Sequence, residues 1–115
     1  MKTIATHERR TFLKDHPPVM QRMLLHSTGV EQDLIAGTVL GEKDGKCGEF
    51  TSGAEALGIL VEDTTIPAAG DVYALVYVHA AVITAELTWG TGVTATEQKT
   101  ALAALRGRGI YASEA

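Results

Sequence analysis

The chain has 115 residues, 45% of them apolar and 21% charged, which suits one small globular domain with a single core. Its lone cysteine, Cys47, excludes an internal disulfide and favours a reducing compartment. The net charge of −4 is uneven: residues 1–26 carry five basic and two acidic side chains (+3), and residues 27–115 carry five and twelve (−7). So small a basic excess argues against nucleic acid as a partner. Phe12 is also the one side chain in residues 1–18 expected to stack on a base.

Residues 1–18 are expected to form a flexible arm ahead of a β-rich domain at 19–115. Pro17 and Pro18 block a helix and favour extended chain, and no helical apolar period precedes them. An arm that orders on a partner and a frayed terminus without a role are equally compatible with this composition. The segment lacks the continuous apolar core of a secretory signal.

The first half of the body is predicted to consist of short strands joined by turns. We expect strands at 19–26, at 34–40 with an interruption at Gly37, at 46–50 and at 57–62. Asp44-Gly45 predicts a tight hairpin between the second and third of these. Residues 51–56 are predicted as a loop, and residues 63–70 as a turn-rich connection.

The segment 71–89, DVYALVYVHAAVITAELTW, is the most apolar in the chain. Asp71, His79 and Glu86 interrupt it, and its valines favour a pleated strand over a helix, which argues against a membrane span. We expect two or three consecutive buried strands, at 71–79, at 80–84 after a possible kink, and at 87–89.

A single helix is predicted near the carboxyl end. Thr94 and Glu97 have the spacing of a capping box, residues 95–105 are rich in helix formers, and Gly107 is the expected C-cap. A last strand is expected at 109–112. The predicted fold class is mostly β (α+β), a small β-barrel-like or β-tulip domain with one short C-terminal helix.

No group of residues predicts catalysis, a metal site or a cofactor. The four histidines lack the spacing of a helical metal site, and His79 is expected to be a core or interface residue. Lys46 could lower the pKa of the Cys47 thiol, but no histidine is near in sequence, so a passive thiol is expected. The acidic pairs flank turns, and the glycines form no phosphate-binding motif. The prediction is a protein that is not an enzyme.

With these elements laid out, residues 36–110 resemble the head decoration protein family of lambda-like tailed bacteriophages. The resemblance rests on an ordered series of segments: AGTVLGEKDGK, ALGILVED, the apolar stretch that ends at Trp89, and EQKTALAALRGRGIYA. It implies a trimer on local threefold positions of the expanded capsid, which it stabilises against packaged DNA, with an arm that orders on the major capsid protein. The arginines and histidines of the leading segment depart from the Ser/Thr/Pro/Gly-rich arm that the family leads one to expect.

The first hypothesis is therefore a homotrimeric structural protein on the outer surface of the virion capsid, made in the bacterial host cytoplasm, with no nucleic-acid or membrane partner. The residues expected to contact the capsid are Ile4, Arg9, Arg10, Phe12, Leu13 and Val19, and those expected in the core or trimer contact are Tyr77 and Trp89. The alternative is a monomeric small β-barrel that binds a ligand or peptide as an adaptor. A third option is an enzyme that uses Cys47.

Overall fold

The structure, a computed structural model, describes residues 18–114. Its elements are β1 (Val19–Leu25), β2 (Gln32–Leu34), β3 (Val39–Lys43), β4 (Lys46–Glu49), β5 (Glu55–Leu60), β6 (Thr64–Ile66), β7 (Val72–Ile83), the 3₁₀ turn η1 (Thr84–Glu86), α2 (Ala95–Arg108) and β8 (Ile110–Ser113). Strands dominate and the one α-helix of this region lies near the carboxyl end, so the predicted fold class is confirmed.

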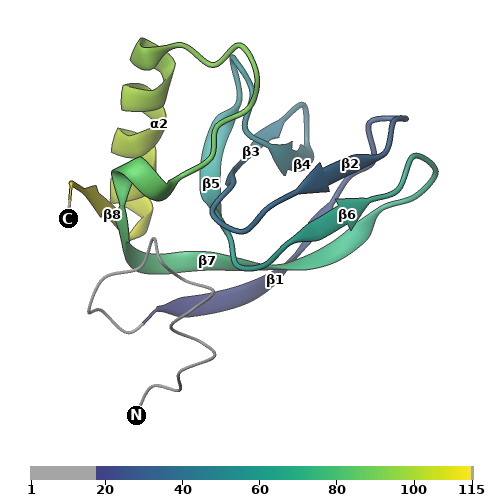
Figure 1. Ribbon diagram of the computed structural model, residues 1–115, viewed down its shortest axis with the longest axis horizontal. Helices are drawn as coiled ribbons and strands as arrows, with labels where there is room; N and C mark the ends of the chain where they lie inside the picture. Colours follow the sequence, from purple (N-terminus) through teal and green to yellow (C-terminus); the bar gives the residue numbers. More distant parts are fainter. Residues whose placement is uncertain (1–17, 115) are drawn as a thin grey trace.

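The main sheet has the strand order β1-β7-β5-β3-β4, and its neighbours are antiparallel. β8 adds to β7 in parallel. The sheet curls, so that the N–H of His26, just after β1, reaches the carbonyl of Cys47 in β4 and donates to it at 2.8 Å. The result is a half-barrel with α2 at one end and the ribbon of β2 and β6 at the other (Figure 1).

The hairpin at Asp44-Gly45 is confirmed. Lys43 pairs with Lys46 across a two-residue turn, and both central residues have positive φ, 55° at Asp44 and 77° at Gly45. Positive φ at both positions defines the turn whose twist matches the flanking strands, which is why Asp-Gly is a reliable hairpin signal.

The predicted strand at 34–40 is wrong as one element. Gly37 has φ 94°, and the N–H of Thr38 donates to the carbonyl of Ile35 at 3.1 Å, so the chain turns there. Leu34 ends β2, and Val39 begins β3 in the other sheet.

The predicted connection at 63–70 is also wrong in part, because it contains β6. Thr64 and Ile66 pair with Leu34 and Gln32 of β2. The strand has three residues between Asp63 and Pro67, too few to show an alternating pattern.

The apolar segment at 71–89 contains one strand of 12 residues, so the prediction of two or three separate strands is wrong. A bulge replaces the expected break: Val19 of β1 lies opposite His79 and Met20 lies opposite Tyr77, which leaves Val78 as the extra residue. After β7 comes η1, and the expected strand at 87–89 is reduced to one bridge between Thr88 and Thr38.

The capping box of α2 is confirmed. The N–H of Thr94 donates to Glu97 Oε1 at 2.9 Å, and the N–H of Glu97 donates to Thr94 Oγ1 at 3.2 Å. The C-cap is Gly109, with φ 102°, and not Gly107, so the helix runs three residues beyond the predicted Leu105.

Two clusters of buried side chains form the core. The larger one joins the sheet to α2 and includes Ile59, Tyr77, Val82 and Leu105. The smaller one fills the half-barrel beneath the β2–β6 ribbon and includes Leu25, Leu34, Leu40, Leu60, Ile66 and Val76. The sheet is therefore buried on both faces along its middle, which explains why its central strands lack a polar-apolar alternation.

Candidate functional site

Five of the residues expected to contact a capsid, Ile4, Arg9, Arg10, Phe12 and Leu13, lie outside the described residues. Val19, the sixth, begins β1 and is 53% exposed. It stands where the leading segment joins the fold. A partner that held this segment would therefore meet Val19 directly.

The two residues expected in the core or trimer contact lie in different environments. Tyr77 is fully buried in the larger cluster, opposite Ile59 of β5. Trp89 is half-buried, and its ring meets that of Phe50 edge to face, with centroids 5.9 Å apart. Trp89 thus anchors the segment after η1 on the loop that follows β4.

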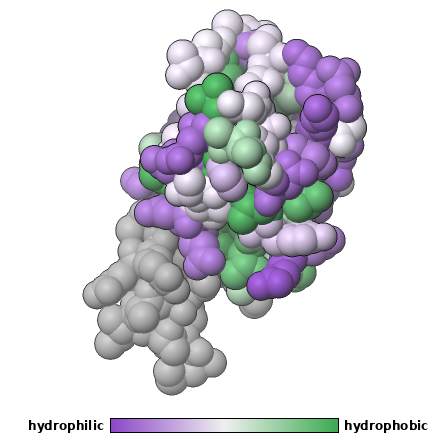
Figure 2. Space-filling model, turned by 90° about the vertical axis from the view of Figure 1, so that its right-hand side faces the viewer, coloured by the Kyte–Doolittle hydropathy of each residue, from purple (hydrophilic) through white to green (hydrophobic). Residues whose placement is uncertain are grey.

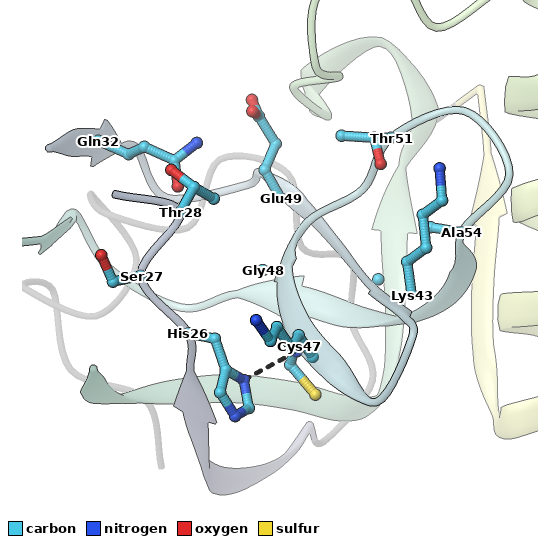
Figure 3. Close-up of a pocket in the computed structure, with 12 residues that line it drawn as sticks. His26, Ser27, Thr28, Gln32, Lys43, Cys47, Gly48, Glu49, Thr51 and Ala54 are labelled. Atoms are coloured by element: carbon cyan, nitrogen blue, oxygen red, sulfur yellow. Dashed lines mark hydrogen bonds between the residues drawn. The ribbon is translucent and has the colours of Figure 1, made fainter. Parts of the chain in front are cut away.

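The structure brings His26 next to Cys47, although 21 residues separate them (Figure 3). His26 Nδ1 accepts the backbone N–H of Cys47 at 3.0 Å, so the proton of the neutral ring is on Nε2. Burial, with a smaller contribution from the Glu42 carboxylate, raises the pKa of the Cys47 thiol. The pKa of the thiol is therefore raised and not lowered, although Lys46 is adjacent in sequence, and the pair is not arranged as a nucleophile with its base.

A hollow of about 340 Å³ lies beside this pair, between the end of β1 and the outer edge of β4. Figure 3 shows side chains of opposite charge at its rim. Its lining includes His26, Ser27, Thr28, Gln32, Lys43, Lys46, Cys47, Gly48, Glu49 and Thr51. Its walls present both polar and apolar atoms. Lys43 Nζ already donates to the carbonyl of Ser52 at 3.3 Å. Within residues 18–114, no cluster of three or more His, Cys, Asp or Glu side chains could hold a metal ion.

The end of the molecule that carries β2 and β6 is acidic, and we call residues 27–36 and 61–71 the acidic tip. These two segments contain five carboxylates and no Lys or Arg: Glu31, Asp33, Glu62, Asp63 and Asp71. Some of the carboxylates also support turns, since Asp63 accepts the N–H of Ala36 at 2.9 Å and Asp71 that of Ser27 at 2.8 Å.

Apolar side chains are also exposed at the acidic tip, where Val30 is 67% and Ile35 52% exposed. Figure 2 looks onto this end and shows separate hydrophobic side chains among hydrophilic ones. Like charges would oppose contact between the tips of two copies. This surface therefore suits a partner that carries basic groups.

The sequence contains one signal for this tip that local motifs do not reveal. No Lys or Arg occurs between Lys46 and Lys99, so every strand from β5 to β7 lacks a basic residue. The contact between His26 and Cys47, by contrast, depends on how the sheet curls and has no local signal.

Fold and surfaces define a small β-rich domain in which a curled sheet packs on one helix, with no helix in residues 18–114 long and apolar enough to cross a membrane. A family model matches residues 13–110, and its description is bacteriophage lambda head decoration protein D. The chain belongs to this family, so the expected resemblance is confirmed. Its role is capsid decoration in a phage head, as a structural protein associated with the virion capsid. Among curated proteins, no match to the chain was found.

Proposed function

We propose that this chain binds as a homotrimer to the local threefold positions of an expanded phage head and stabilises it against the pressure of packaged DNA. It is made in the bacterial host cytoplasm, ends on the outer surface of the virion and contacts the major capsid protein. The observation that carries the proposal is the match of a decoration-protein family to residues 13–110, most of the chain.

In such a role, the stabilisation of the shell comes from many identical binding sites. A protein that binds the assembled lattice but not its dissociated subunits stabilises the lattice by mass action, by about 2.7 kcal/mol per site at a free concentration a hundredfold above Kd. Many sites on one shell then add up, so a modest affinity at each site is sufficient. No chemistry is required of the decoration protein.

The leading segment is the proposed capsid contact. Ile4, Phe12 and Leu13 offer apolar side chains for burial on the shell, and Arg9 and Arg10 offer charge that orients the segment. Val19 continues this contact at the start of β1, where it is exposed. The basic segment and the acidic body carry opposite net charge, so complementary charge on the shell would help to set the register of the subunit.

The test is to mix the purified full chain with expanded capsids that lack decoration, sediment them, and measure the protein taken up. We expect saturable uptake and a higher disruption temperature or chelator resistance of the decorated capsids. Unexpanded capsids in parallel establish whether binding depends on expansion. Absence of uptake by expanded capsids would contradict the proposal.

Light scattering separates this proposal from the monomeric adaptor. A mass near that of three chains supports the trimer, and a mass of one chain at every concentration supports the adaptor.

A further inference from the structure

The outer face of α2 is basic, although the body of the chain is acidic. Ala101 and Leu105 of the helix are buried against the sheet, whereas Lys99, Ala103 and Arg106 are exposed. The three exposed residues follow one another at intervals of four and three positions, so they lie in one row along the helix. We call these three residues the helix face.

No carboxylate of α2 offsets the charge of the helix face. Glu97 is the one acidic residue of the helix, and it accepts hydrogen bonds from the Ser52 hydroxyl and from the backbone N–H of Thr94. Arg108, the third basic residue of α2, pairs with Glu55 at 2.8 Å. Within residues 18–114, neither cation of the helix face forms an ion pair. Both are therefore available to a partner.

The acidic tip carries the opposite charge, also in a row. Glu31, Asp33 and Ile35 are exposed and alternate with the buried Leu34, so they share the outer face of the β2–β6 ribbon. Val30, their neighbour in sequence, is 67% exposed. The tip thus combines carboxylates with apolar side chains. The alkyl stems of a lysine and an arginine suit both, because they offer apolar surface behind a charged end.

The helix face and the acidic tip do not meet within one molecule. α2 lies at one end of the half-barrel, and the β2–β6 ribbon lies at the other (Figure 1). A contact between these surfaces therefore joins two copies, and it uses a different surface on each of them. Contacts of this head-to-tail kind can close into a ring.

We propose that the helix face of one copy binds the acidic tip of the next copy. The inference rests on the proposed trimer, because three such contacts complete a ring of three. Complementary charge identifies the occupant of each surface. Copies with a net charge of −4 repel one another as a whole, and this pairing brings the exposed cations of α2 to the carboxylates of the tip.

The test reverses the charge on each surface and then on both. Lys99→Glu with Arg106→Glu places carboxylates against the tip, and Glu31→Lys with Asp33→Lys places cations against the helix face. We expect each pair of substitutions to weaken association of the full chain by about tenfold or more. A chain with all four substitutions again has opposite charges at every contact, so we expect it to recover most of this loss.

Two further variants serve as controls. Lys43→Glu with Lys46→Glu makes the same change in net charge as the helix variant, but on the β3–β4 hairpin, and should change association by less than about twofold. Because Asp33 accepts the Thr65 hydroxyl at 2.8 Å, Glu31→Lys alone is a milder tip variant that leaves this bond in place. Sedimentation equilibrium measures association, and circular dichroism confirms that each variant is folded.

Capsid uptake, measured in parallel, separates the other possible occupants. If neither reversal weakens association, or if the chain with all four substitutions is as weak as the single reversals, the inference is overturned. It is also overturned if the tip reversal keeps the mass and loses uptake, because the tip then binds the capsid. If only deletion of residues 1–18 abolishes association, the leading segment occupies the tip, and the inference is wrong.

Failure of the proposed trimer gives a different result. An unchanged chain that is a single subunit at every concentration overturns both the trimer and this inference, while its own uptake shows whether it still decorates the shell. An unchanged chain with the mass of three subunits and variants of the same mass overturns this inference alone.

Discussion

At the scale of single residues, Gly58 allows β5 to lie close against β7. A Cβ added there would lie 2.6 Å from Val76 Cγ1 and 2.7 Å from the carbonyl oxygen of Tyr77. The second neighbour is backbone, so relief requires the strands to separate. We expect Gly58→Ala to lower the free energy of unfolding by about 1–3 kcal/mol, as overpacking does elsewhere.

Gly48→Ala is the matched control, since Gly48 also lies in a strand and a Cβ there would have no heavy atom within 4 Å. Urea unfolding followed by circular dichroism measures both. Equal midpoints for the two variants would show that the sheet accommodates the methyl group at Gly58.

The Cys47 thiol is a second feature that single substitutions can probe. Its raised pKa, caused first by burial and then by the Glu42 carboxylate, predicts slower alkylation near pH 8 than for an exposed cysteine. Glu42→Gln removes the smaller cause and should lower the pKa and speed the reaction. Glu31→Gln at the acidic tip serves as the control. The alkylation rate of Cys47, measured against pH for each variant, tests this prediction. A rate unaffected by Glu42→Gln would exclude a role for the Glu42 charge.

At the scale of elements, the sequence predicted those whose signals are local and missed those that depend on distant partners. The Asp44-Gly45 hairpin and the capping box of α2 are read from a few adjacent residues. β6 exists because β2 lies beside it, and those strands are 30 residues apart along the chain. Gly107 and Gly109 are equally suitable C-caps in sequence. The structure uses Gly109, because Ile110 then enters the ladder beside Ala80.

The same reasoning applies to the candidate surfaces. The charge asymmetry was visible in the sequence, but the pairing of His26 with Cys47 arises from the curl of the sheet. The bulge depends on one extra residue, Val78, in the pairing of β1 with β7. A run of apolar residues does not reveal where such a residue falls, so the sequence predicted a kink and not its consequence.

The amino end of α2 has its own pH dependence. Hydrogen bonds from the Ser52 hydroxyl and then from the Thr94 backbone lower the pKa of Glu97 below its ordinary value of 4.5. A lowered pKa means that the ionised carboxylate stabilises the fold. Its contribution is complete above the unfolded pKa and is lost as the pH falls through the folded pKa.

We therefore expect Glu97→Gln to reduce stability at pH 7 and to reduce it less as the pH falls below about 4.5. Thermal unfolding of the variant and the unchanged chain between pH 7 and pH 3 measures this difference. A difference that stayed constant over the whole range would exclude the carboxylate as its source. Thr94→Ala, which removes the hydroxyl of the same capping box, should cost about 1 kcal/mol at pH 7 and less at low pH, because this hydroxyl also helps to lower the pKa of Glu97.

At the scale of the whole molecule, the acidic tip lies at the end of the β1–β7 ribbon opposite the start of β1. β1 begins at Val19, opposite His79, and ends at Leu25, opposite Val72, from which the chain continues to the tip. On a lattice of mixed charge, this acidic end would orient a subunit before any close contact forms.

The last prediction concerns the leading segment as a unit. Deletion of residues 1–18 should leave the folded domain and its association unchanged and should weaken capsid uptake, because Pro17 and Pro18 separate this segment from the first strand at Val19. Circular dichroism, sedimentation and capsid uptake of the shortened chain measure the three properties separately. Replacing Arg9 and Arg10 with glutamine in the full chain is the milder variant, expected to reduce uptake most at low salt, where screening is weak. Unfolding of the shortened chain would contradict the boundary at residue 18, because it would show that the domain needs these residues for its own stability.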